Sequence, residues 1–190
     1  MNTAQPIRDK HHVTQILSYY HNKGDARNNL LINLCIYTSL RISDILRLST
    51  NDVYDFKSHR VRKSITITEK KTGKSKTIAL HKNLVTTLRL TLQSAKPNMP
   101  LIYNKRTNKA ISRIQAYRII RKAADDIGIP HNVSCHSLRK VFGYHSWQAG
   151  KHPSIITEAY NHSSYAVTRR YLGIMQDDVN SAYLELSFLS

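Results

Sequence analysis

Acidic residues are scarce in this sequence, and the scarcity is informative. The 190 residues include 12 Asp and Glu against 29 Lys and Arg, which leaves a formal net charge of +17 at pH 7. Such an excess of one sign repels itself and favours an anionic partner. We therefore expect the chain to bind nucleic acid, with an anionic membrane surface as the alternative.

Long apolar runs are also missing. No stretch approaches the roughly 18 residues that a membrane-spanning helix needs. The opening MNTAQPIRDKHH has no apolar segment of the kind that a signal peptide carries. The sequence thus disfavours the membrane alternative. We expect a cytoplasmic protein, associated with the nucleoid if the source is a bacterium.

Cysteine is nearly absent, because only Cys35 and Cys135 are present. Two cysteines are too few for a disulfide framework. Cys135 precedes His136, which suggests a metal, but no CxxC or HxxxH pattern completes a zinc-binding set. We therefore expect two free thiols, no metal and no other cofactor.

The hydrophobic fraction of 41% suits one domain that is mostly helical. Apolar periodicity predicts helices at residues 12–23, 82–94, 111–127, 137–149, 153–160 and 164–172. Asp25 is expected to cap a further helix, and Ser43 a short turn over SDILRLS. Gly128 and Gly150 are expected to end the helices that precede them.

Two segments alternate like strands. VRKSITIT at 61–68 and SKTIAL at 75–80 are rich in β-branched residues, and EKKTG between them supplies turn chemistry. They predict a β-hairpin with a lysine-rich tip. The expected fold class is therefore mainly α with a small antiparallel β-sheet (α+β).

The segment 111–127 predicts an amphipathic helix whose polar face is basic. That face carries Arg113, Tyr117, Arg118, Arg121 and Lys122. A solvated surface is the ordinary explanation for such a face. Because no acid balances it before Asp125, we favour contact with phosphates, with Tyr117 placed to lie on a sugar or base.

Two motifs place arginine where an anion would bind. CHSLRK spaces His136 and Arg139 three residues apart, so that both side chains point the same way on a helix. TSLRISDILRL places Arg41 in an otherwise apolar run, where a guanidinium needs a partner such as phosphate. The alternatives are a surface His–Arg pair and an ion pair of Arg41 with Asp44.

A third motif, NHSSYAVTRRYLGI, places His162 nine residues before Tyr171 and two arginines directly ahead of that tyrosine. Val167, Tyr171 and Ile174 also fit an apolar helical stripe, so packing is the alternative to chemistry. Cations beside a tyrosine favour its phenolate, which is the form that attacks phosphorus.

Taken in order, SLRISDILRL, EKKTGKSKTIAL, HSLR and NHSSYAVTRRY resemble the catalytic domain of the tyrosine recombinases, or phage integrases, from about residue 25 to 175. The resemblance implies the fold of that catalytic domain and an activity that cleaves and rejoins DNA strands without a metal. It also implies the roles of individual residues: Tyr171 as nucleophile, Arg41 and Arg139 as phosphate clamp, His136 and His162 as the two histidines, and Lys71 as hairpin lysine, with Lys70 as its alternative. Lys74 and Arg169 are further expected DNA contacts.

The resemblance is not complete. Ser39 and Asn161 stand where the family usually has glycine, and Asp44 where glutamate is usual. Only about 24 residues precede the similar region, as in short members such as the bacterial DNA invertases. The alternatives are a remnant of a mobile genetic element and a sequence from which an N-terminal DNA-binding domain has been removed.

We expect three parts: an N-terminal extension with a helix at 1–24, the catalytic domain at 25–175, and a tail helix at 176–190. The tail carries an apolar stripe, which could fold back on its own domain. The resemblance implies instead that it docks on a neighbouring protomer, so we expect self-association on double-stranded DNA, from dimer to tetramer.

Three functions fit these features. The first is a site-specific recombinase for integration, excision or inversion. A type IB topoisomerase would use a similar site. A non-catalytic DNA-binding accessory protein or regulator would explain the charge but not the complete catalytic set, so we favour the recombinase.

Overall fold

The computed structural model describes residues 4–93, 95–174, 178, 180, 183 and 184. Its helices are α1 (Lys10–Asn22), α2 (Ala26–Tyr37), α3 (Ile42–Ile45), α4 (Thr50–Val53), α5 (Lys82–Thr91), α6 (Arg113–Ile127), α7 (Cys135–Gln148), α8 (Pro153–Ala159) and α9 (Tyr165–Leu172). The helices predicted before residue 175 are present, with ends that differ from the prediction by at most three residues.

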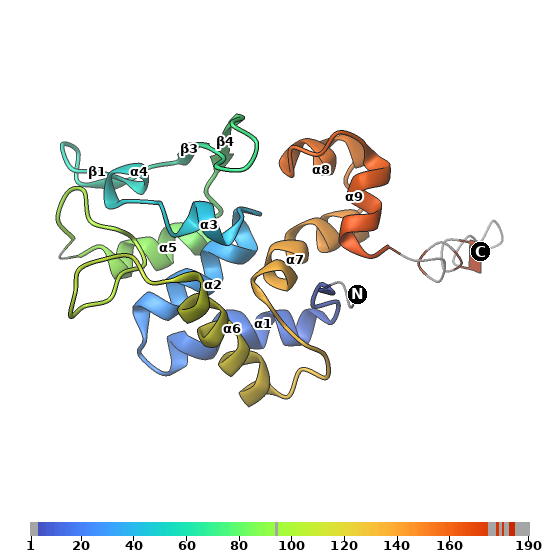
Figure 1. Cartoon of the computed structure of the whole chain (residues 1–190), viewed down its shortest axis with the longest axis horizontal. Coiled ribbons are helices and arrows are strands. Elements are labelled where there is room, and N and C mark those ends of the chain that lie inside the picture. The colour runs from blue at the N-terminus through green and yellow to red at the C-terminus, as the bar shows by residue number, and fades with distance from the viewer. Residues whose placement is uncertain (1–3, 94, 175–177, 179, 181–182, 185–190) are drawn as a thin grey trace.

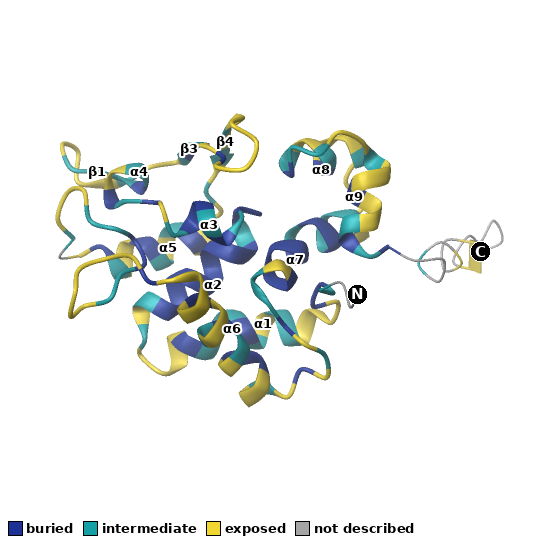
Figure 2. Cartoon of the chain, viewed as in Figure 1, coloured by how far each residue is buried: buried dark blue, intermediate teal, exposed yellow. Residues whose placement is uncertain are grey.

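Helix α2 lies at the centre of the molecule (Figure 1). It is buried from Asn28 to Ile36, and α1, α5 and α7 all pack against it. Figure 2 shows the exposed residues on the outer faces of the surrounding helices. Ile7, Ile16 and Tyr20, which lie in the expected N-terminal extension, belong to this main core.

Two antiparallel ribbons complete the α+β fold. The first pairs β1 (Tyr54–Asp55) with β2 (Arg60–Val61), and the second pairs β3 (Ser64–Thr68) with β4 (Ser75–Ala79). The second ribbon is the predicted hairpin. The predicted strand 61–68 is wrong at its start, because Val61 pairs with Tyr54 in the other ribbon.

Most helix ends follow the sequence signals. The Asp25 side chain accepts a hydrogen bond from the Asn28 amide at 3.0 Å, and Gly128 ends α6 with a φ of 79°. The prediction for Ser43 is wrong, because α3 starts one residue earlier and Arg41 is its N-cap. Helix α7 has Ala149 as its C-cap, and Gly150, with a φ of 71°, follows it.

Helices α8 and α9 form a second, smaller cluster against α7. Its buried residues are Ile156, Tyr160, Leu172 and Ile174. The backbone of α7 approaches this cluster at Gly143, whose amide donates to the Tyr160 hydroxyl at 2.9 Å. Glycine is required there, because a Cβ at position 143 would lie 2.5 Å from Tyr160 Cε2 and 2.7 Å from Leu172 Cδ2.

Most of the tail helix expected at 176–190 lies outside the described residues, and its docking stays a prediction. Within the described part of the chain, Tyr183 and Leu184 are exposed. No helix there is both long and apolar enough to cross a membrane.

We expect Gly143→Ala to destabilise the protein. Overpacking of this kind costs about 1–3 kcal/mol, which exceeds the roughly 1 kcal/mol that alanine gains over glycine in a helix. Because the contacts at position 143 are so short, the cost should lie in the upper half of that range, and urea unfolding should show a net loss of about 1–2 kcal/mol. Ser146→Ala on the same helix should change the free energy of unfolding by less than about 0.5 kcal/mol; equal effects of the two substitutions would contradict the close approach.

Candidate active site

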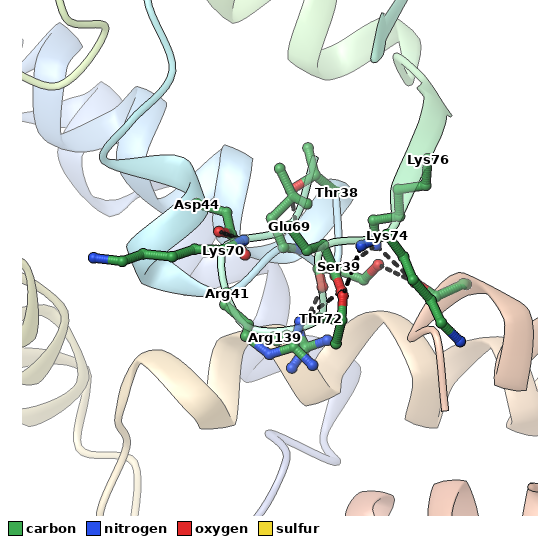
Figure 3. A network of polar contacts seen from close by, with 12 residues as sticks. Thr38, Ser39, Arg41, Asp44, Glu69, Lys70, Thr72, Lys74, Lys76 and Arg139 are labelled. Carbon is green, nitrogen blue, oxygen red and sulfur yellow. Dashed lines mark hydrogen bonds and ion pairs between the residues drawn. The ribbon is translucent and has the colours of Figure 1, made fainter. Parts of the chain in front are cut away.

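A buried carboxylate holds Arg41. Glu69 Oε2 lies 2.7 Å from Arg41 Nη1, and the Glu69 side chain is fully buried at the base of the hairpin turn (Figure 3). Burial alone would raise the pKa of Glu69, but the nearby Arg41 and Asn161 side chains and the Thr72 hydroxyl, which donates to Oε2 at 2.9 Å, outweigh it and lower the pKa to about 2. Glu69 is therefore an anion at neutral pH.

The alternative partner of Arg41 was Asp44, and the structure does not form that pair. Asp44 Oδ1 instead accepts from the Lys70 amide at 3.0 Å. Glu69 and Asp44 therefore attach the hairpin turn to the start of α3 at two points. Sequence reasoning missed Glu69, although the period-two pattern of β3 puts Ile65, Ile67 and position 69 on one face.

Lys76 is a second cation in this cluster that sequence reasoning missed. Its Nζ donates to the Ala159 carbonyl oxygen at 2.8 Å and lies 3.6 Å from Glu69 Oε1. Burial lowers the pKa of Lys76, and Glu69 opposes that shift. The alternation of β4 gave a signal here too, because Lys76 shares its face with Ile78.

Arg139 projects from α7 into the same cluster. Its Nε donates to the Ser39 carbonyl oxygen at 2.7 Å, and its guanidinium lies 5.0 Å from the Tyr160 ring centroid. Tyr160 also donates its hydroxyl to the Arg139 carbonyl oxygen at 2.8 Å. Arg139 Nη2 is buried and has no hydrogen-bond partner among the described residues. The guanidinium is thus fixed on one edge and keeps donor capacity on the other.

Tyr171 lies beside that guanidinium. Arg139 Nη1 is 3.5 Å from Tyr171 Oη, and the guanidinium carbon is 5.4 Å from the ring centroid. Burial raises the pKa of Tyr171, while Arg139 and Arg41 oppose the rise. Tyr171 also packs on the α8–α9 cluster, so packing and a position beside the cations coexist.

His162 completes this group. Its ring stacks on Tyr160 at 5.2 Å and meets Tyr171 edge-on at 5.1 Å. Nδ1 lies 3.1 Å from Thr168 Oγ1. Burial and the nearby Arg139 and Arg41 lower the pKa of His162 to about 4. The imidazole is therefore neutral at pH 7.

His136 faces a neighbouring cavity of about 600 Å³ at the start of α6 and α7. Arg113, Tyr117 and Ile42 line the same cavity. Burial lowers the pKa of His136, and Arg139 and Lys140 lower it further. The structure thus places the first histidine between the arginine cluster and the basic helix.

The expected hairpin lysines lie outside the cluster. Lys71 is exposed in the turn, as are Lys70 and Lys74, while Arg169 is exposed on α9. Figure 3 shows the Lys70 side chain pointing away from Arg41 and Arg139. Any function of these side chains requires a ligand that approaches from solvent.

The basic face of α6 divides into two halves. Arg121 pairs with Asp125 at 2.7 Å, and Lys122 with Asp126 at 3.3 Å. These acids are four residues further along, a spacing that the sequence already contained. Arg113 and Arg118 of the first half are exposed and have no ion pair among the described residues.

Two residues of the site have left-handed backbone conformations. Ser39 has a φ of 53° and Asn161 a φ of 54°. Glycine adopts such angles without strain, whereas other residues hold them only where the surrounding structure imposes them. Here the conformation of Ser39 aims its carbonyl oxygen at Arg139 Nε, which donates to it at 2.7 Å.

Comparison with known proteins identifies the class. Residues 8–176 match the model of the phage integrase family, and the chain belongs to that family. It is 39% identical over 183 residues to the probable integrase/recombinase YoeC of Bacillus subtilis (strain 168), with 96% of this chain and 97% of that protein covered.

More distant relatives are longer. The chain is 26% identical over 161 residues to the tyrosine recombinase XerA of Pyrococcus horikoshii. That alignment covers 83% of this chain but 54% of XerA. A crystal structure of XerA recombinase matches 97% of the chain and 66% of that structure with a TM-score of 0.75 at 20% identity. XerH bound to difH in a post-cleavage complex matches 96% of the chain and 53% of that structure, with a TM-score of 0.70 at 18% identity. These likenesses confirm the catalytic-domain fold.

The lowered pKa of His162 should make stability depend on pH. Unfolded His162 takes up a proton near its ordinary pKa of 6.5, whereas the folded protein resists protonation down to about 4. Stability from this group is therefore present above pH 6.5 and is lost as the pH falls towards 4.

His162→Gln keeps a polar side chain but does not titrate. Its free energy of unfolding should fall less than that of the wild type between pH 6.5 and 4, by about 1–2 kcal/mol after allowance for solvent screening. Urea unfolding at several pH values measures the difference, and the other histidines cancel because both proteins contain them. Parallel pH profiles would contradict a buried neutral His162.

Proposed function

We propose that this chain is a site-specific recombinase of double-stranded DNA. Tyr171 Oη attacks a scissile phosphate, the Oη–P bond forms as the bond to the 5′ oxygen breaks, and a 3′-phosphotyrosyl intermediate results. Attack by the 5′ hydroxyl of another strand reverses the step and completes strand exchange. The contact of Arg139 with Tyr171 carries the proposal, because it joins a phosphate-binding group to a nucleophile at 3.5 Å.

Arg41 and Arg139 would bind the non-bridging oxygens of the phosphate. Charge accumulates on those oxygens in the transition state, and two fixed guanidiniums stabilise it without a metal. Arg139 has buried donor capacity left for such a ligand. His136, at the edge of the cluster, would add a hydrogen bond.

Tyr171 must lose its proton when it attacks, because burial keeps its phenol protonated. His162 is the proposed acceptor. Thr168 Oγ1 can donate to the Ser164 carbonyl oxygen, and it then accepts from His162 Nδ1–H. We assign this tautomer from the hydrogen bonds; it leaves Nε2 free to take a proton.

The leaving 5′ oxygen needs a proton in return, and Lys71 is the proposed donor. Lys71 is exposed in the hairpin turn, where its side chain can reach a bound substrate from solvent. Lys76 instead contacts Glu69 and the Ala159 carbonyl within the protein. We assign it to holding the hairpin.

Double-stranded DNA would also contact the basic surface. The first half of α6 would contribute Arg113, Tyr117 and Arg118, and the exposed Lys74 and Arg169 would add further contacts. Arg121 and Lys122 would have to exchange their carboxylate partners for phosphates. Among the structural neighbours is a lambda integrase dimer bound to a COC′ core site. Self-association on DNA is part of the proposal, as is action in the cytoplasm at the nucleoid.

The first test is covalent capture on nicked duplexes that tile the DNA flanking the gene. Wild type should form an adduct that resists denaturation, in EDTA as well as in Mg²⁺. Tyr171→Phe should bind the same duplex and form no adduct. The mass of this uncleaved protein–DNA complex, measured under native conditions, gives the number of protomers on DNA. Arg139→Lys should form adduct about 10²-fold more slowly or worse, because lysine lacks the bidentate fork.

Adduct formation by Tyr171→Phe would exclude Tyr171 as the nucleophile. Binding by wild type without adduct on any duplex would favour the alternative, a non-catalytic DNA-binding protein. Relaxation of supercoiled DNA without a specific site would favour a type IB topoisomerase.

A second test separates the two lysines. Lys71→Ala should slow cleavage of an ordinary duplex about 10²-fold or more. A 5′-bridging sulfur in place of oxygen makes a better leaving group that needs no proton, so this substrate should restore the rate of Lys71→Ala. Lys76→Ala should slow both substrates equally, because it disturbs the site rather than the leaving group. If the 5′-bridging sulfur substrate restored the rate of Lys76→Ala and not that of Lys71→Ala, Lys76 would be the proton donor and Lys71 would not.

A further inference from the structure

The backbone of residues 4–8, here called the N-terminal strap, crosses α7 at two points. The Ala4 carbonyl oxygen accepts from Lys140 Nζ at 2.5 Å, and the Ile7 carbonyl oxygen lies 3.0 Å from His145 Nε2. The Ile7 side chain is fully buried in the main core. Figure 1 shows this end of the chain beside α7.

Arg8 extends the strap to the helix that carries Tyr171. Its Nη2 donates to the Gly173 carbonyl oxygen at 2.6 Å, and its Nη1 pairs with Asp178 at 3.2 Å. Gly173 is the left-handed C-cap of α9, with a φ of 71°. A cation suits this end of a helix, because unsatisfied carbonyls and the negative end of the dipole lie there.

Lys140 connects the strap to the nucleophile from the other side. Its Nζ lies 4.8 Å from the centroid of the Tyr171 ring while it donates to Ala4. Burial lowers the pKa of Lys140, and no carboxylate pairs with it among the described residues. The Ala4 carbonyl thus fixes a side chain that lies against the ring of Tyr171.

Helix α9 needs such contacts because its own packing is limited. It has eight residues, and Thr168 and Leu172 are its buried positions. Thr168 Oγ1 lies 3.2 Å from Thr157 Oγ1 of α8, and Leu172 packs within the α8–α9 cluster, which is separate from the main core. The strap bridges the two, since Ile7 belongs to the main core and Arg8 holds the end of α9.

We propose that the N-terminal strap positions Tyr171 for attack, with Arg8 as the positioning residue that fixes the end of α9. The proposal rests on the proposed recombinase function. A nucleophile must be held close to its in-line geometry, and a displacement near 1 Å can cost about 10² in rate. Loss of the Arg8 contact should therefore slow strand cleavage, whereas DNA affinity, which depends on other surfaces, should change little.

The test compares Arg8→Ala with two controls. Arg8→Lys keeps a cation that can reach the Gly173 carbonyl. Lys10→Ala removes one exposed positive charge two residues away, and so controls for charge alone. The first measurement is amide hydrogen exchange in the DNA-free protein. Exchange in residues 165–174 should be about 10-fold faster or more in Arg8→Ala, with residues 26–37 unchanged and both controls close to wild type.

The second measurement is the single-turnover rate of adduct formation on the nicked duplex that wild type cleaves, with the dissociation constant measured on the same duplex. Arg8→Ala should react about 10-fold more slowly or worse, bind within about 2-fold of wild type, and be rescued by Arg8→Lys. Two results would contradict the proposed role of the strap. One is unchanged hydrogen exchange in residues 165–174 of Arg8→Ala, and the other is faster exchange in that variant with a cleavage rate equal to that of wild type. Faster exchange in Arg8→Ala while wild type cleaves no duplex would support the anchoring of α9 and contradict the recombinase function instead.

Discussion

Burial of positive charge is the constraint on which the site depends. Arg41, Arg139 and Lys76 converge in one cluster, and Glu69 is the carboxylate that contacts two of them. Cations brought together away from water are costly unless an anion compensates them. Glu69 provides that compensation only in part, so the cluster keeps an excess of positive charge. Such an excess favours an anionic ligand such as a phosphodiester, whose negative charge would offset part of it.

The same ion pairs position the backbone. Glu69 and Asp44 attach the hairpin to α3, and Lys76 attaches it to the end of α8. Three parts of the chain that are distant in sequence thus meet around one carboxylate. The left-handed conformations of Ser39 and Asn161 belong to this arrangement, since non-glycine residues hold such angles only where the surrounding structure imposes them.

The proposed nucleophile, Tyr171, is held differently from the two arginines that would bind the phosphate. Arg41 and Arg139 come from elements that pack on α2, whereas Tyr171 and His162 belong to the small cluster of α8 and α9. The two groups meet through Tyr160, which binds the Arg139 carbonyl and stacks on His162. Tyr160 thus joins two separate packing units.

Local patterns in the sequence determined most of the fold and the identity of the candidate site. Apolar periodicity placed the helices, β-branched alternation placed the hairpin, and the motifs around Arg41, Arg139, His162 and Tyr171 identified residues that the structure brings together. These features depend on neighbours within a few residues, which a linear pattern contains. The ion pairs of Arg121 and Lys122 and the inward face of Lys76 were also present as local spacing.

Tertiary structure alone decided the partners. No spacing rule connects Glu69 to Arg41, Lys140 to Ala4 or Arg8 to Gly173, because these pairs form only when distant segments pack. The lowered pKa of His162 likewise results from burial beside Arg139 and Arg41. The sequence alone therefore determined which groups could perform the chemistry. Packing decided which of them are charged, held and compensated, because burial and Coulomb energies depend on distances in space and not along the chain.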